Sequence, residues 1–408
     1  MRWVIFFGFL FITQFYAFQA IKTATQNKIL IGIYISFVSI IYALLLYYSY
    51  ARFAGFTHSM SFYIGFFLAL SVFQLVLISV VFLEDVTRFF QFLFSYTKNN
   101  LNYDQTSFPE RRKFISQAAI ILASIPFSAM LYGMYKGKYN YKVLSYDLEF
   151  DDLPSSFDGF KITQISDLHC GSFDNPEKVE YGINLVNDQK SDVILFTGDI
   201  VNNKSEELLP WVKSFSSLKA PSGIFSVLGN HDYGDYYDWK NKEAKKANMD
   251  LLLSTKKKMG WTLLNNDSVY IDKNGEKIAI VGVENWGKGR FKKAGDLNKS
   301  VEKISKKDFK VLLTHDPSHW DAEVLKHNHK FHLTLSGHTH GFQFGIEIPG
   351  FFKWSPSQWQ YKQWAGIYEK NKQFLNVNRG FGYLGYPGRV GIWPEITVIT
   401  LKKTKSKI

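Results

Sequence analysis

Hydrophobic and polar positions follow two different patterns along the chain, and the change comes near residue 140. Before it lie four long runs without a charged side chain, at Trp3–Ile21, Ile29–Ala51, Phe62–Leu83 and Phe114–Tyr135. Each run is long enough to cross a bilayer core of roughly 30 Å as a helix of about 20 residues. The fourth is the least apolar, because Pro126 and several serines interrupt it. The pattern predicts a helical transmembrane anchor of about four spans over residues 1–138.

From residue 139 to residue 408, short apolar runs alternate with segments of helical periodicity and with polar turns. Short apolar or alternating runs bounded by turn residues predict strands at Tyr141–Phe150, Trp261–Leu264, Ser268–Ile271, Lys277–Gly282 and Glu395–Leu401. Helical spacing predicts connecting helices at Glu177–Gln189, Leu208–Leu218 and Trp239–Lys258. Parallel strands need crossovers of this kind. We therefore expect an α/β fold for this second domain, with two stacked mixed β-sheets flanked by helices.

Five of the apolar runs end in side chains that bind metals. They lead to Asp167 and His169, to Asp199, to Asn230-His231-Asp232, to His315, and to His338 and His340. A strand followed by a tight turn places its last side chains at the edge of a sheet, so five such strands side by side would bring these groups together. Carboxylate oxygen and imidazole nitrogen are the ligands that hard and borderline divalent cations prefer. The sequence thus predicts a two-metal site.

The order of these motifs resembles that of the calcineurin-like metallophosphoesterase family, in its membrane-anchored bacterial branch. The resemblance covers nearly all of the chain from about residue 145 and is carried by Asp167-Leu-His169, Gly198-Asp199, Gly229-Asn-His-Asp232, Thr314-His315 and Gly337-His-Thr-His340. It implies the four-layer sandwich of that family and the hydrolysis of a phosphate ester or pyrophosphate.

The resemblance also implies a role for each residue of the site. Asp167, His169 and His340 would bind one divalent cation, Asn230, His315 and His338 a second, and Asp199 would bridge the two ions. The ions would be Mn, Fe, Zn or Co, because mixed Asp, His and Asn ligands accept each of them. Two such ions about 3.5 to 4 Å apart activate a shared water for attack on phosphorus.

His231 and Asp232 lie beside these ligands without being needed as ligands. We expect His231 to be the catalytic acid that protonates the leaving oxygen or steadies its charge. Asp232 has two interpretations: a catalytic partner that holds the His231 ring, or a turn residue that caps the next segment.

Two further segments near the C-terminus have alternative interpretations. Arg379 and Arg389 lie in glycine-rich turns and would either bind the substrate phosphate or face solvent. An aromatic cluster would either contact an acyl chain or the bilayer, or pack on its own domain; it comprises Phe351, Phe352, Trp354, Trp359, Tyr361, Trp364 and Tyr368.

The net charge of +12 suits a domain near anionic lipid headgroups or one that acts on phosphorylated substrates. No nucleic-acid-binding motif accompanies it, so we expect no nucleic-acid partner. The single cysteine, Cys170, excludes an intrachain disulfide.

Basic residues in the short connections predict the orientation of the anchor. The loop before the fourth run holds Arg88, Lys98, Arg111, Arg112 and Lys113, and the first connection, on the same side, holds Lys22 and Lys28. The opposite side has Arg2, Arg52, Lys136, Lys138 and Lys142. This asymmetry places the loop in the cytoplasm and the second domain outside it. Arg111-Arg112 also resembles a twin-arginine export signal, although a basic stop beside a span explains it equally well.

These features together predict a membrane-anchored, metal-dependent phosphohydrolase whose substrate is a lipid or another cell-envelope phosphate. Two alternatives stay open. One is a phosphodiesterase of nucleotides or nucleic acids that uses the same metal site, and the other is a non-catalytic membrane sensor with an inherited metal site.

Overall fold

A computed structural model describes residues 2–50, 58–97, 109–348 and 350–404. The chain divides into two compact units, one made of Met1–Phe53 and Ser59–Gly133, the other of Ala54–His58 and Met134–Ile408. The first unit is helical, and the second contains both large sheets.

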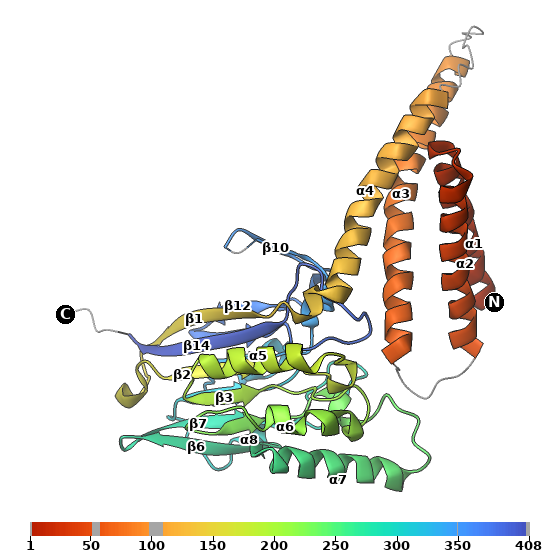
Figure 1. The fold of residues 1–408 in the computed structure, drawn as a ribbon. Helices are drawn as coiled ribbons and strands as arrows, with labels where there is room; N and C mark the ends of the chain where they lie inside the picture. Colours follow the sequence, from red (N-terminus) through yellow and green to blue (C-terminus); the bar gives the residue numbers. More distant parts are fainter. Residues whose placement is uncertain (1, 51–57, 98–108, 349, 405–408) are drawn as a thin grey trace. The chain divides into compact units, whose positions relative to one another are not determined.

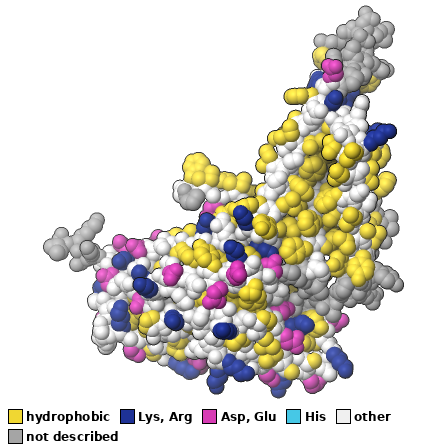
Figure 2. All heavy atoms as spheres, viewed as in Figure 1, with side chains coloured by type: hydrophobic (Ala, Val, Ile, Leu, Met, Phe, Trp, Pro, Cys, Tyr) yellow, Lys and Arg dark blue, Asp and Glu magenta, His cyan; other side chains and the backbone are white. Residues whose placement is uncertain are grey.

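The first unit consists of four long apolar helices, as predicted: α1 (Arg2–Ala24), α2 (Lys28–Tyr50), α3 (His58–Thr97) and α4 (Pro109–Tyr135). All four are long and apolar enough to span a bilayer. Apolar side chains cover much of their outward surface (Figure 2). These helices imply contact with a lipid bilayer, and the chain is a multi-pass membrane protein. Helix α3 is 40 residues long and continues well beyond the predicted span.

One of the paired arginines binds an acidic pair on α3. Arg112 Nη1 donates to Glu84 Oε2 at 3.1 Å and Arg112 Nη2 donates to Asp85 Oδ2 at 3.3 Å. This arginine therefore helps to pack α4 against α3, and the export signal stays a prediction. Arg52 and Lys98, which carry part of the predicted charge asymmetry, lie outside the described residues.

The second unit contains two mixed six-stranded sheets. The first sheet has, in spatial order, β1 (Lys142–Phe150), β14 (Glu395–Lys403), β2 (Lys161–Ile165), β3 (Val193–Phe196), β4 (Ile224–Ser226) and β5 (Trp261–Leu263). The second has β12 (Gly366–Lys370), β13 (Gln373–Val377), β9 (Leu333–Ser336), β8 (Lys310–Leu313), β7 (Glu276–Gly282) and β6 (Asp267–Lys273). The first sheet is parallel from β2 to β5 and the second from β13 to β7.

Apolar side chains from both sheets fill the space between them, including Ile162, Leu195, Val311 and Leu335. Helices α5 (Pro176–Asp188), α6 (Val212–Phe215) and α7 (Lys242–Lys258) pack on the outer face of the first sheet (Figure 1). The short helices α8 (Leu297–Ser300) and α9 (Ser318–Ala322) contribute Leu297 and Trp320 to a third cluster against the second sheet. The predicted stack of two mixed sheets flanked by helices is thus confirmed.

Short 3₁₀ segments connect these elements: η1 (Gly137–Tyr139), η2 (Ser155–Phe157), η3 (Cys170–Ser172), η4 (Ser205–Trp211), η5 (Asn230–Tyr233), η6 (Val324–Lys326), η7 (His340–Gln343) and η8 (Pro356–Trp359). A separate antiparallel hairpin of β10 (Ile346–Ile348) and β11 (Phe352–Trp354) projects from the second unit (Figure 1). The sequence pattern did not predict this hairpin or strands β12 and β13.

Candidate metal centre

The predicted metal ligands follow the C-terminal ends of five parallel strands. Asp167 and His169 follow β2, Asp199 follows β3, and Asn230 opens η5 after β4; His315 follows β8, and His338 and His340 follow β9. The five strands do not lie in one row, because three belong to the first sheet and two to the second. The ligands still meet, since both sheets end at the same edge of the sandwich.

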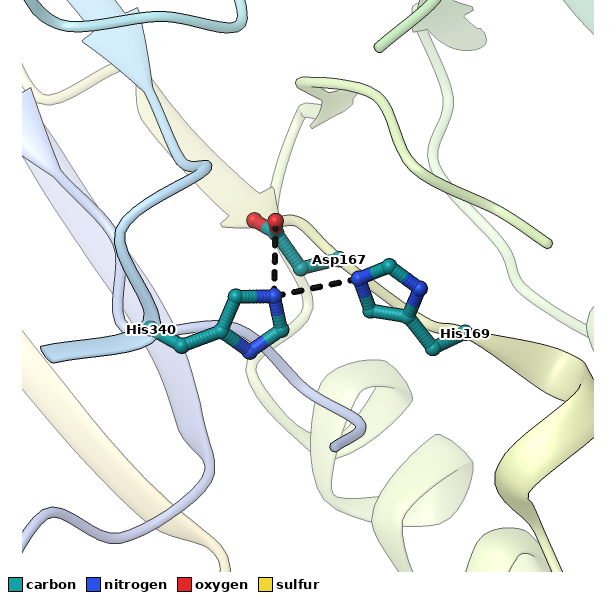
Figure 3. A group of neighbouring side chains, drawn as sticks. All are labelled: Asp167, His169 and His340. Carbon is teal, nitrogen blue, oxygen red and sulfur yellow. Dashed lines mark hydrogen bonds and ion pairs between the residues drawn. The ribbon is translucent and has the colours of Figure 1, made fainter. Parts of the chain in front are cut away.

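Asp167, His169 and His340 form the first group of metal-binding side chains (Figure 3). His340 Nε2 lies 3.1 Å from Asp167 Oδ1 and 3.1 Å from His169 Nε2. All three residues are buried. Their ligand atoms converge within 4.8 Å of one another, which is close enough to share one cation.

Asp199, His315 and His338 form the second group. His315 Nε2 lies 3.1 Å from Asp199 Oδ2 and 3.2 Å from His338 Nδ1. The same Asp199 oxygen lies 3.7 Å from Nε2 of His169 in the first group. Asp199 is therefore the carboxylate that two neighbouring cations would share.

Asn230 provides a further oxygen beside these groups. Its amide nitrogen donates to the hydroxyl of Tyr236 at 2.9 Å. The amide oxygen is buried and has no hydrogen-bond partner. Because an unpaired buried acceptor is costly, this atom fits a metal ligand. The residues present thus fit two divalent cations with oxygen and nitrogen ligands.

Hydrogen bonds from the far side of the imidazole rings orient two of the histidines. His315 Nδ1 donates to the carbonyl oxygen of Thr197 at 2.7 Å, so Nε2 is left for a metal. His338 Nε2 lies 2.8 Å from the hydroxyl of Tyr361, so Nδ1 is the nitrogen that faces the site. Partners of this kind fix the tautomer and the angle of a ligating ring.

The ionisable groups of the site shift one another's pKa values. Burial opposes ionisation of Asp199, but the adjacent His315 and His231 imidazoles keep the pKa of its carboxyl well below the usual range. Burial likewise disfavours a charged His315, yet the contact with Asp199 raises its pKa to about 10. Burial and the nearby His315 lower the pKa of His338 to about 4. The metal-free site therefore carries a proton on His315 that a cation would replace.

Two glycines of the motifs are required by close approaches to the ligands. A Cβ atom on Gly229 would lie 2.2 Å from Asp199 Oδ1, and one on Gly337 would lie 2.2 Å from Asp167 Oδ2. Five ligands also have left-handed backbone conformations, with φ between 48° and 72°: Asp167, His169, Asp199, His338 and His340. Residues other than glycine rarely adopt this backbone conformation. The surrounding fold therefore keeps these ligands in locally strained conformations.

His231 borders the site as predicted, but its ring is not held by Asp232. The Asp232 carboxylate is buried and accepts hydrogen bonds from the backbone N–H groups of Asp199, Ile200 and Gly229 at 2.8 to 3.0 Å. Of the two interpretations of Asp232, these bonds favour the turn residue that caps its segment over the partner of the His231 ring. Although the two residues are adjacent in η5, their side chains have different partners, since His231 Nδ1 binds the carbonyl oxygen of Asn202. Asp232 instead fixes the loop that carries Asp199.

Neither of the two predicted phosphate-binding arginines is free. Arg379 is buried, and its Nη2 forms a 2.6 Å ion pair with Glu347 while its Nη1 binds Glu395 at 2.5 Å. Arg389 is buried too; its Nη2 donates to the carbonyl oxygen of Arg379 at 2.8 Å and lies 3.3 Å from His340 Nδ1. Contact of either arginine with phosphate has no support in this geometry, since both guanidinium groups are used inside the protein.

A pocket of about 470 Å³ lies over the two groups. Side chains from several loops line it, among them Arg290, Phe291, Phe342, Tyr361 and Tyr386, together with His231. Arg290 is exposed and was missed by the sequence analysis, because nothing in its own segment marks it as part of a site. Tyr361 is buried, so it packs within its domain, which was one of the two interpretations of the aromatic cluster.

Comparisons with known proteins agree with this arrangement. Residues 1–138 match the family model "Probable Calcineurin-like phosphoesterase, transmembrane domain", and residues 160–342 match "Calcineurin-like phosphoesterase". The uncharacterized metallophosphoesterase YkuE of Bacillus subtilis is 30% identical over 279 residues, which cover 67% of this chain and 90% of that protein.

Two more distant similarities extend this comparison. A transmembrane protein with metallophosphoesterase domain from Danio rerio is 26% identical over 283 residues, and the match covers 67% of this chain but only 60% of that protein. The crystal structure of phosphopantetheinyl hydrolase from Mycobacterium tuberculosis aligns with 54% of this chain and 89% of its own, at 14% identity and a TM-score of 0.32. A similarity this low carries no conclusion about substrate.

Proposed function

Because this chain belongs to the calcineurin-like phosphoesterase family, we propose that it is a membrane-anchored, two-metal hydrolase of a phosphate ester or a pyrophosphate. The observation that carries the proposal is the position of Asp199, whose Oδ2 atom faces a histidine of each group. A carboxylate shared in this way is what a binuclear site needs, whereas a single-metal site has no use for the second group.

Each part of the site has a task in this reaction. Two divalent cations, when bound, supply an activated hydroxide and the positive charge that neutralises the phosphate oxygens. Mn, Fe, Zn or Co would suit the mixed ligands. Arg290 at the pocket offers a planar guanidinium to a phosphate oxygen that the cations leave unpaired.

His231 would give a proton to the leaving oxygen or stabilise its developing charge. Its Nδ1 donates to the carbonyl oxygen of Asn202, and its ring lies 4.4 Å from the ring of Tyr236, measured between centroids. Held from two sides, the ring presents Nε2 to the pocket that it lines.

A lipid or another cell-envelope phosphate is the substrate class that we propose. The spans confine the second unit to a bilayer, which raises the local concentration of any membrane-borne substrate. The basic loop before α4 supports an extracytoplasmic position of the second unit. A reporter fused after Ile408 should read as extracytoplasmic, and a cytoplasmic signal would overturn this orientation.

The test of the activity uses the full chain in detergent, stripped with a chelator and then loaded with Mn²⁺. We expect hydrolysis of p-nitrophenyl phosphate or bis-p-nitrophenyl phosphate, and a loss of about 1,000-fold in Asp199→Asn, since loss of the shared carboxylate removes several kcal/mol of transition-state stabilisation. Asp272→Asn, which changes an exposed carboxylate on β6, is the matched control and should keep the full rate.

Metal content measured on the same samples distinguishes the alternatives. Two bound ions without turnover on any phosphate substrate would favour a non-catalytic sensor and would refute the proposal. Preference for nucleotide diesters over lipid phosphates would favour the nucleotide phosphodiesterase. The half-exposed ring of Phe342 at the pocket is a surface on which a base would stack in that case.

A further inference from the structure

The β10–β11 hairpin has one apolar face and one polar face. Its register pairs Ile346 with Trp354 and Ile348 with Phe352, so these four side chains share one face. The exposed fractions of Ile346, Ile348 and Phe352 are 56%, 52% and 48%, and Phe351 at the turn is 86% exposed. Figure 2 shows the resulting apolar cluster on the projecting hairpin. Contiguous exposed patches of this kind usually mark a binding surface.

The polar face of the hairpin is bound to the body of the second unit. Glu347 pairs with Lys353 across the hairpin register. The Glu347 carboxylate forms an ion pair with the buried Arg379, and Lys353 Nζ donates to the carbonyl oxygen of Ala365 at 2.5 Å. These bonds fix the polar face inward. The apolar face of the hairpin therefore points away from the body of the second unit.

A basic loop contributes to the pocket over the metal centre. Residues 288–293 include four exposed cationic side chains: Lys288, Arg290, Lys292 and Lys293. The pocket is lined by Arg290 and Phe291 from this loop, and by Phe342 and Gln343 from the segment that leads directly into β10. The pocket is thus lined both by part of a basic loop and by the segment that leads to the apolar hairpin.

The connection to the membrane spans identifies the partner of this surface. Helix α4 ends at Tyr135 and β1 begins at Lys142, so at most about 25 Å of extended chain separates the last span from the first sheet. A domain on so short a tether stays at a bilayer surface. That surface offers hydrocarbon to apolar side chains and negative charge to basic ones.

We propose that the second unit has its own attachment to the bilayer, in which the apolar face of the β10–β11 hairpin inserts among the lipids and the 288–293 loop binds anionic headgroups. The metal centre then lies at the level of the headgroups, where a lipid phosphate can enter the pocket without leaving the membrane. The attachment itself does not depend on the proposed activity, because insertion requires no turnover.

Site-specific fluorescence in the full chain tests the insertion. Cys170, the only cysteine, is buried, so Phe351→Cys can be labelled selectively with an environment-sensitive dye. The protein is reconstituted into nanodiscs that contain anionic phospholipid and nitroxide-labelled lipid. Asp272→Cys is the matched control, because it lies at an exposed position of β6. We expect several-fold stronger quenching by the nitroxide lipid at position 351 than at position 272.

Three outcomes would overturn the proposal. Equal quenching at both positions would show that the hairpin stays in water. A blue-shifted dye without lipid quenching would show that the apolar face packs on the spans of its own chain. Dependence of the signal on the number of copies per nanodisc would show that it packs on a second copy.

Charge reversal tests the part played by the basic loop. Lys288→Glu with Lys293→Glu should reduce the quenching at position 351 in anionic nanodiscs, and added salt should do the same. Lys257→Glu with Lys258→Glu on α7 makes the same change in charge at exposed positions outside this surface and should leave the quenching unchanged. Equal effects of the two pairs would refute a specific role for the loop. All these readouts are binding measurements, so a failure of the proposed hydrolysis would not affect them.

Discussion

His231 Nδ1 lies 2.6 Å from the carbonyl oxygen of Asn202, and this bond sets which ring nitrogen can act on a substrate. A carbonyl only accepts, so Nδ1 carries a proton and Nε2 is the atom that exchanges one with the leaving group. We expect His231→Gln to lower kcat by about 10² to 10⁴ with unchanged metal content.

The size of that loss should depend on the leaving group. p-Nitrophenolate leaves without a proton, whereas an alkoxide needs one, so aryl substrates should suffer less than alkyl substrates in His231→Gln. Rates measured over a series of leaving-group pKa values check this. A uniform loss across the series would assign the ring to charge stabilisation instead of proton transfer.

The substitution Asp232→Ala should lower the stability of the folded protein. Asp232→Ala leaves the buried N–H groups of Asp199, Ile200 and Gly229 without their acceptor, and it removes a negative charge that favours the charged form of the buried Lys256. Removal of one partner from buried polar contacts of this kind costs about 3 to 5 kcal/mol. We expect a clear drop in melting temperature together with loss of metal, while His231→Gln melts like the natural protein. An unchanged melting temperature in Asp232→Ala would contradict the role of Asp232 in fixing the loop.

Metal affinity should rise with pH. The contact with Asp199 raises the pKa of His315 to about 10, so the metal-free protein carries this proton at neutral pH and a cation must displace it. One displaced proton makes the apparent affinity rise about tenfold per pH unit below that pKa. Calorimetric titration with Mn²⁺ in buffers of different ionisation enthalpy measures the released proton. An apparent Mn²⁺ affinity that stays the same between about pH 6 and about pH 8 would contradict this displacement of a proton.

Arg290 should control substrate binding. Arg290→Ala removes the guanidinium from the pocket, and a lost hydrogen bond to a charged group, worth about 1.5 to 3 kcal/mol, corresponds to a rise in KM of about 10- to 100-fold. Metal content should stay at the level of the natural protein. Lys257→Ala, which removes a charge on α7 outside the pocket, is the control. A change in kcat alone would place Arg290 in the chemical step instead.

The convergence of the candidate metal ligands could be predicted from the sequence, because each of them lies within a few residues of a short apolar strand and few residue types bind metals. The spans could be predicted for a similar reason, since length and lack of charge are local properties. In contrast, Arg290 and Asn202 reach the site only because loops that are distant in the sequence meet there. The sequence could not decide between the two interpretations of Asp232, because the partners of its carboxylate depend on how η5 packs against the loop of Asp199.

The fold of the C-terminal third was predicted least well. Strand β12 is half-buried at one edge of the second sheet, and β13 is mostly buried beside it. The segment that contains both strands also has many aromatic residues, which obscure strand periodicity. The aromatic cluster proved to be two sets. Tyr361 and Trp364 are buried, whereas Phe351 and Trp359 face outward. Composition alone does not separate such sets.

The left-handed backbone at the ligands has an evolutionary consequence. Asp199, with φ of 60°, and His338, with φ of 72°, are held in conformations that glycine adopts without strain and asparagine tolerates. A descendant that no longer needed the metals would gain stability from such replacements, because selection for catalysis would no longer oppose them. Glycine or asparagine at these positions would thus indicate a relative that has lost catalytic activity, and its sequence would show this before any assay.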